Sequence, residues 1–389
     1  MAENRWNRYT ETISALCILQ SVLKSTESKF PRSPQTNNFS VSYQQYSRSV
    51  TWRLSLLAVT TMLLPVMLCV SISVGAASVP LWDTVVIFCG GEVEPRLAKI
   101  VLEIRLPQAL AAVLAGAGLA ISGATMQGVL RNPLSSPMTL GISNAAAFGA
   151  ALALFIGGAS ISAMDKSIIG GFSQGMIALC AFGCATITAV LILMLGRLHG
   201  SRSEVIILVG VALNSLFAAG ITLLQYLADD SRLAAIVYWA FGDTARANWN
   251  AIMLMIACLL PISVWFLSQS WNYNAIVLGE ETALGLGVPV RRVRLVTMLL
   301  SSFLTAVLVS LLGIIGFVGL VVPHVARLCV GVDNRFLLPF SLVFGGLLLL
   351  GADTFARVVF APHLLPVSIL TAFIGVPIFL GMLLGKRSV

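Results

Sequence analysis

Repeated runs of about twenty apolar residues limit the fold of this chain more than any other feature. At about 1.5 Å per residue, a helix of that length crosses the roughly 30 Å hydrocarbon core of a bilayer. Charged residues make up only 10% of the chain, whereas a soluble domain carries about 25%. The alternation with a period of two that marks a membrane β-barrel is not evident. We therefore predict an all-α polytopic membrane protein.

Ten apolar segments are predicted to cross the membrane, and they form a single ten-helix domain at 51–389. The predicted spans are 54–77, 105–130, 138–158, 172–195, 205–227, 251–268, 295–312, 313–331, 337–355 and 367–384. The stretch 228–249 is polar and aromatic. It is predicted to lie at the membrane surface, because tryptophan and tyrosine favour the level of the headgroups.

Residues 1–50 differ from the rest of the chain, because they are polar and rich in serine, asparagine and glutamine. We predict a disordered tail, or a weak surface helix near Thr10–Leu23. An alternative is that translation begins near Val50. The apolar part of the tail is short and broken, so a secretory signal is not predicted.

The charges of the loops predict the orientation. Ten crossings place both termini on one side, and more loop lysines and arginines fall on that side than on the other. The positive-inside rule therefore predicts cytoplasmic termini. The basic residues are scattered among short loops, so no nucleic-acid partner is predicted. Seven cysteines occur without a CxxC pair, and we interpret them as packing residues and predict no metal site.

A short polar stretch, Leu278–Arg294, interrupts the apolar pattern with the sequence LGEETALGLGVPVRRVR. We predict a short helix here, with carboxylates in a first turn that the helix dipole stabilises. Leu284 and Leu286 offer an apolar contact, so this stretch is predicted to bind a partner protein outside the bilayer. The alternative is an ordinary amphipathic helix that lies on the membrane.

Polar side chains at membrane depth face a bundle interior or a water-filled path. Gln127, Asn144, Asn214 and Gln225 are therefore weak candidates for lining a path, and hydrogen bonding between helices is the alternative for each. Asp353 and Arg357 have helical i,i+4 spacing, which predicts a local ion pair.

Four blocks of the sequence, in order, resemble the FecCD-type permeases of binding-protein-dependent ABC importers. They are 105–154, which begins RLPQALAAVLAG, LGEETALGLGV at 278–288, GFVGLVVPHVARLCVGVDNRFLLP at 316–339, and ADTFARVVFAPHLLPVSILTAFIGVPIF at 352–379. The resemblance covers about residues 51–389. It implies the type II ABC importer permease fold, with about ten transmembrane helices, in the bacterial inner membrane.

The resemblance also implies partners and site residues. It implies two cytoplasmic ATPase subunits, a periplasmic solute-binding protein and a second permease, identical or paralogous. Residues 278–290 would form the segment that contacts the ATPase, through Leu278, Gly279, Glu280, Glu281, Ala283, Leu284 and Gly287. Leu284 and Gly285 replace residues that are often more polar in the family. The other implied contacts are Arg105 and Arg357, which would meet carboxylates of the binding protein; Gln108 departs from the family's RLPR motif.

The expected function is ATP-driven import of an iron-siderophore complex, with haem or cobalamin as alternative cargo. The motif G-x-x-x-x-G-K-[ST] is absent, so a separate chain is expected to hydrolyse ATP and this chain is expected to bind no cofactor. H-E-x-x-H and G-x-S-x-G are also absent, and no enzymatic activity is predicted. An ion-coupled secondary transporter is the alternative from another class; it commonly needs ionisable residues or broken helices at the midplane.

Overall fold

The computed structural model describes residues 35–75, 80–88, 90–91, 93–157, 174–198, 203–359 and 365–384. The chain divides into two compact units, Met1–Trp52 and Arg53–Val389. The first helix, α2, runs from Gln35 to Ser73, although its span was predicted to begin at residue 54. No proline or glycine occurs between Pro34 and the apolar run, so nothing interrupts a helix there. The weak helix predicted near Thr10–Leu23 lies outside the described residues.

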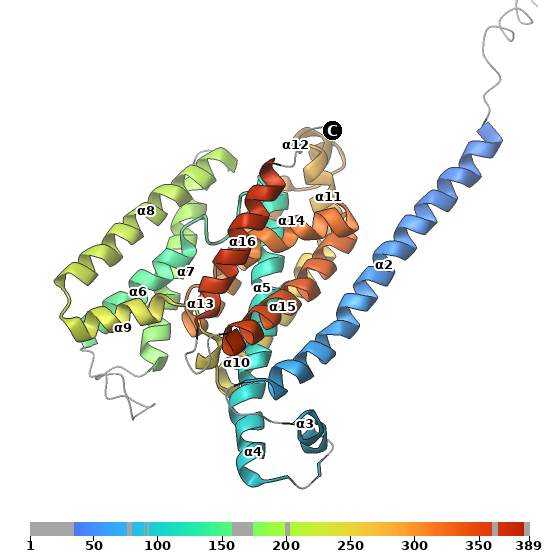
Figure 1. Ribbon diagram of the computed structural model, residues 1–389. Helices are drawn as coiled ribbons and strands as arrows, with labels where there is room; N and C mark the ends of the chain where they lie inside the picture. The colour runs from blue at the N-terminus through green and yellow to red at the C-terminus, as the bar shows by residue number, and fades with distance from the viewer. Residues whose placement is uncertain are drawn as a thin grey trace, which may run out of the picture. The chain divides into compact units, whose positions relative to one another are not determined.

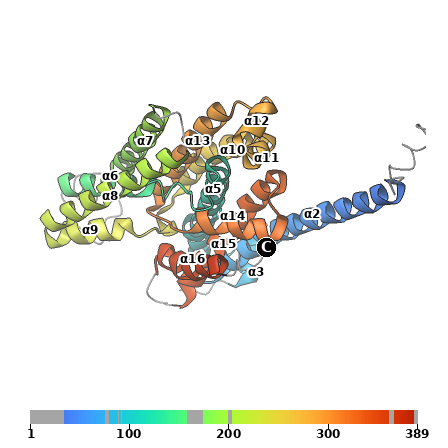
Figure 2. The same ribbon diagram turned by 90° about the horizontal axis from the view of Figure 1, so that it is seen from above.

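The second unit consists of helices (Figures 1 and 2). Within the described ranges, the only β contact is an isolated bridge between Phe241 and Ile314. The elements after α2 are α3 (Leu81–Phe88), α4 (Pro95–Lys99), the π-helical turn η1 (Ile100–Arg105), α5 (Leu106–Leu130), α6 (Ile142–Gly157), α7 (Gln174–Leu198), α8 (Ser203–Leu227), α9 (Asp230–Ala240), the 3-10 turn η2 (Thr244–Arg246), α10 (Trp249–Ser268), α11 (Ser270–Leu278), α12 (Glu280–Gly285), α13 (Val290–Leu312), α14 (Val318–Val330), α15 (Asn334–Val359) and α16 (Val367–Leu384).

The predicted set of membrane helices is confirmed. Among the described residues, seven helical stretches are long and apolar enough to cross a bilayer, and three shorter apolar helices accompany them at Ile142–Gly157, Val318–Val330 and Val367–Gly381. These stretches coincide with the ten predicted spans. The predicted surface stretch 228–249 forms α9 and η2.

Helix α5 is the centre of the second unit, where it packs against α10, α13, α14 and α15 (Figures 1 and 2). In its apolar window, 83% of residues are buried, compared with 11% in α8. Its sequence is rich in glycine, alanine and serine. Small residues let membrane helices approach closely, which is how such helices gain packing energy without a hydrophobic driving force between them.

Two glycine pairs bring α5 into backbone contact with its neighbours. A Cβ atom on Gly116 would lie 2.2 Å from the carbonyl oxygen of Gly345 in α15. One on Gly123 would lie 1.7 Å from the carbonyl oxygen of Gly319 in α14. Real Cβ atoms do not approach so closely, so the spacing between these helices requires glycine at both positions.

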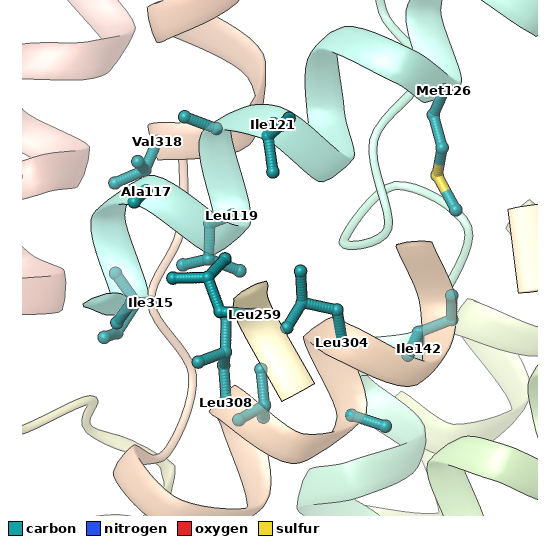
Figure 3. Close-up of a cluster of buried hydrophobic side chains, with 14 of the residues drawn as sticks. Ala117, Leu119, Ile121, Met126, Ile142, Leu259, Leu304, Leu308, Ile315 and Val318 are labelled. Atoms are coloured by element: carbon teal, nitrogen blue, oxygen red, sulfur yellow. The ribbon is translucent and has the colours of Figure 1, made fainter. Parts of the chain in front are cut away.

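Leucine side chains fill the space on another side of α5. Leu119 of α5 lies with Leu259 of α10 and with Leu304 and Leu308 of α13 (Figure 3). All four are buried. The cluster therefore joins three helices that are far apart in the sequence.

The outer face of α8 is apolar and open. Leu208, Leu216 and Leu223 are 71%, 63% and 58% exposed. In water such a stripe would be costly, whereas in a bilayer it contacts acyl chains that are equally apolar. This face is suited to lipid or to another membrane subunit.

We expect Gly123→Ala to destabilise the protein by about 1–3 kcal/mol, because the added methyl group has no space against α14. Thermal unfolding in detergent measures this as a lower Tm. The matched control is Gly128→Ala on the same helix, where an added Cβ meets nothing within 4 Å and where alanine is the better helix former. Equal melting temperatures for the two variants would contradict the close packing of α5 on α14.

Candidate functional site

The polar stretch between α10 and α13 folds as two short helices joined at a glycine. α11 ends at Leu278, and Gly279 follows with φ +139° and ψ 150°. Side chains rarely adopt this conformation, so the junction favours glycine. α12 then begins with Glu280 and Glu281 in its first turn, where carboxylates interact favourably with the helix dipole. The short helix predicted in this stretch is present.

The surface of this stretch is apolar and accessible. Leu278, Leu284 and Leu286 are 72%, 57% and 66% exposed. Between Leu278 and Pro289, only Ala283 and Val288 are buried. Exposed apolar residues rimmed by charge mark an interaction surface.

A glycine fixes where α12 ends. Gly287 has φ +80°, and its N–H donates to the carbonyl of Leu284 at 2.9 Å. The next N–H, of Val288, donates to the carbonyl of Ala283, also at 2.9 Å. These two bonds make a Schellman cap, with Ala283 and Val288 as its apolar contact. The capped backbone at Gly287 therefore fixes the C-terminal end of α12, and with it the length of the helix.

A shallow groove lies beside α12. Its walls include Leu284 of α12, Arg197 at the end of α7 and Arg291 in the first turn of α13. Both arginines are exposed. The apolar surface of α12 therefore has a positive edge.

A buried arginine connects α12 to the central helix. The side chain of Arg294 is 3% exposed, and its Nη2 lies 3.0 Å from Oε2 of Glu280. Its Nε donates to the carbonyl of Val129 in α5 at 3.1 Å. Arg294 was not among the predicted site residues. The spacing could have revealed it, because Val290, Arg294 and Thr297 follow helical periodicity on the buried face of α13.

A second set of polar contacts joins α11 to the start of α15. Nδ2 of Asn274 donates to Oδ1 of Asp333 at 2.8 Å, and its Oδ1 accepts from the backbone N–H of Asn334 at 2.8 Å. Arg335 lies over the ring of Trp271, 4.4 Å from its centroid, and pairs with Asp333 at 2.6 Å. Burial opposes the charged form, but the hydrogen bonds from Arg335 and Asn274 outweigh it and lower the pKa of the Asp333 carboxyl to about 2. The start of α15 is thereby fixed to α11.

The structure places Arg105 and Arg357 inside the subunit, each 8% exposed or less. Nη1 of Arg105 donates to the carbonyls of Ile72 and Ser73 at 2.7 and 3.0 Å. Arg357 pairs with Asp353 at 3.1 Å, which confirms the predicted ion pair. Both arginines therefore have partners within the subunit; docking of a binding protein at Arg105 and Arg357 stays a prediction.

Asp353 is also the centre of a buried polar network. Its Oδ1 accepts from Nε2 of Gln108 at 3.2 Å and from the hydroxyl of Thr244. Gln108 is the residue that departs from the family's motif, and it links α5 to α15 here. Burial of a carboxylate requires such partners.

A mainly apolar cavity of about 240 Å³ has two of the predicted path residues in its wall. Nδ2 of Asn144 donates to Oδ1 of Asn214 at 2.9 Å, so each is also hydrogen-bonded between helices, the alternative considered for both. The cavity wall includes Ser143 and Thr305 and contains no ionisable side chain. The hydroxyl of Thr305 is buried and has no hydrogen-bond partner among the described residues.

The other two predicted path residues lie outside this cavity wall. Nε2 of Gln127 donates to the carbonyl of Leu320 at 3.4 Å, which is a contact between helices. Gln225 is half-buried in α8. A path-lining role for these two residues stays a prediction.

Phe317 was missed by the sequence analysis, because a positive φ leaves no signal in an aromatic residue. It precedes α14 with φ +65°, and it lines both the cavity around Asn144 and Asn214 and an apolar cavity between α14, α15 and α16. A Cβ on Gly375 of α16 would lie 2.6 Å from Phe317 Cβ. A bulky residue in this region is strained, and such strain is found at functional positions.

The described part of the chain gathers no group of three histidine, cysteine, aspartate or glutamate side chains that could hold a metal ion. The absence of a cofactor stays a prediction. The arrangement offers a short exposed helix at one end, where α13 begins, and a buried ion pair at the end where α5 begins.

Known proteins have sequences similar to this chain. A provisionally named ABC transporter permease protein of Methanocaldococcus jannaschii is 51% identical over 285 residues, 73% of this chain and 81% of that one. The hemin transport system permease of Yersinia pestis is 36% identical over 82% of this chain and 91% of its own. Permeases named for vitamin B12 import in Klebsiella pneumoniae and molybdate import in Haemophilus influenzae are 37% and 36% identical, over 89% and 76% of this chain and 97% and 83% of theirs.

A solved structure shares the fold. It is described as an inward-facing conformation of a provisionally assigned metal-chelate type ABC transporter, and it matches with a TM-score of 0.74 and 33% identity over 86% of this chain and 99% of that one. The model of the FecCD transport family matches residues 63–385. The chain therefore belongs to the FecCD transport family and is a permease subunit of an ABC importer.

Proposed function

We propose that this permease imports an iron-siderophore complex across the bacterial inner membrane, driven by two cytoplasmic ATPase subunits that bind at α12. A periplasmic binding protein delivers the cargo to a pair of permease subunits, identical or paralogous, whose termini are cytoplasmic. Haem and cobalamin are the alternative cargoes.

The observation that carries this proposal is the exposed helix α12, whose C-terminal end is capped at Gly287. Its leucines form an apolar surface, and its length is set by the cap at Gly287. A helix of six residues has little stability of its own. Such a helix keeps its leucines in water only at a cost, which a partner cleft offsets by covering them.

The chain contributes two conformations to the transport cycle. ATP binding closes the ATPase dimer, and α12 moves with it. The path between the two permeases then opens to the other side. A partner shifts this equilibrium only through contacts that differ in free energy between the two states.

The cavity around Asn144 and Asn214 supports a cargo that is delivered rather than selected by the permease. Its lining consists of hydroxyl, amide and apolar groups without an ionisable residue. Such a lining binds no single charge strongly, so a complex can pass without being trapped. The solved metal-chelate relative supports a metal complex as the cargo.

We expect Glu280→Lys combined with Glu281→Lys to weaken ATPase association about tenfold or more, because the change reverses the charge of the exposed first turn of α12 and removes the partner of buried Arg294. Co-purification and ATP-driven uptake measure the effect. Glu281→Lys alone separates the surface effect from the Glu280–Arg294 pair. Control substitutions are Glu94→Lys and Glu103→Lys, exposed carboxylates near the start of α5. If association and uptake survive the double change, α12 does not bind the ATPase.

The cargo is tested in proteoliposomes that contain the permease with the ATPase and binding protein encoded beside it. Ferric siderophore, haem, cobalamin and molybdate are supplied in turn. We expect ATP-dependent accumulation of the ferric siderophore, and accumulation of another compound alone would replace it as the cargo. Uptake driven by an ion gradient without the ATPase would contradict the importer mechanism.

A further inference from the structure

We propose that Arg294 is a positioning residue that makes α12 and α5 move as one rigid piece, an inference that rests on the proposed binding of the ATPase at α12. One guanidinium touches both elements, at 3.0 Å from Glu280 and 3.1 Å from the carbonyl of Val129. Its side chain is 3% exposed. A buried charge is tolerated only with good partners, so both contacts are costly to break.

The carbonyl of Val129 needs this contact. It lies in the last turn of α5 and would ordinarily accept from the residue four positions later, which is Pro133 and has no N–H. The N–H groups beyond the helix donate instead to Gln127 and Gly128. Arg294 therefore caps α5, and a cation at this end also interacts favourably with the helix dipole.

The same guanidinium also pairs with a carboxylate at the N-terminal end of α12. Glu280 is in the first turn of that helix, where a carboxylate is favoured. The C-terminus of α5 and the N-terminus of α12 are thus joined through one ion. A guanidinium suits this role, because its N–H donors point in fixed and different directions and can bind two separate acceptors at once.

α12 has few other restraints. Only Ala283 is buried among its six residues, and glycines with positive φ flank it at Gly279 and Gly287. The joint between Asn274 and Asp333 holds α11 to the loop before α15. Arg294 is the contact that ties α12 to α5, and the glycine pair Gly116–Gly345 brings α5 into backbone contact with α15.

The test measures the distance between α12 and the far end of α5 by double electron–electron resonance. Nitroxides are placed at exposed Thr282→Cys in α12 and exposed Glu103→Cys in η1, just before α5, in a chain whose seven native cysteines are replaced and which is diluted into unlabelled permease. The complex with its ATPase is held in nanodiscs, with and without ATP and vanadate. ATPase binding is measured on the same samples.

In the complex with Arg294 intact, we expect one distance distribution that keeps its width and centre when ATP and vanadate are added. Arg294→Gln is expected to broaden or shift the distribution with nucleotide while ATPase binding is retained. Arg294→Lys is expected to keep part of the rigidity, because an ammonium retains the charge but not the fork. The control Arg292→Gln, on an exposed neighbour in α13, is expected to keep the distribution unchanged.

A rigid distribution in Arg294→Gln with the ATPase bound overturns this inference and leaves the proposed function intact. Loss of ATPase binding in Arg294→Gln alone also overturns it, because the residue would then act on docking. Failure of the unmodified permease to bind the ATPase overturns the proposed function and this inference together. Where Arg294→Gln does not fold, Glu280→Gln breaks the same link from its exposed side, and an unchanged distribution there has the same meaning as for Arg294→Gln.

Discussion

Backbone contact between helices is the constraint on which this subunit depends. The pairs Gly116–Gly345 and Gly123–Gly319 hold α5 against α15 and α14 at distances that no Cβ allows. Lipid chains are as apolar as leucine, so helices in a bilayer are held by close packing and by hydrogen bonds. These glycines therefore set how closely α5 lies against α14 and α15.

Polar interactions are concentrated at the two ends of this packed bundle. Arg294 and Asn274 join helices where α13 begins, and Asp353 joins α5, η2 and α15 at the other end. Between them lie mostly small and apolar contacts. This distribution suits a subunit that changes conformation, because the central packing stays constant while the polar joints decide which elements move together.

The sequence was sufficient for the spans and for the exposed helix, because hydropathy and the glycines at Gly279 and Gly287 act locally. It was insufficient for features set by three-dimensional neighbours. Arg294 was counted among several loop cations; its spacing from Val290 and Thr297 separates it from Arg292, but its contact with Val129 becomes visible only in the structure. Arg105 and Arg357 match motifs of the family, but the contacts of Arg105 with Ile72 and Ser73 come from a helix 32 or more positions away. The start of α2 at Gln35 was missed because polar residues carry no periodic apolar signal.

The cap at Gly287 has a consequence for how such permeases diverge. The end of α12 is determined by two backbone hydrogen bonds and one glycine, and the side chains of the exposed leucines on and beside this helix take no part in those bonds. Substitution at Leu278, Leu284 or Leu286 can therefore alter which ATPase a permease binds without changing the fold of the helix. Gly287 keeps the shape of α12 constant, whereas the exposed leucine side chains can vary and so determine which ATPase surface fits.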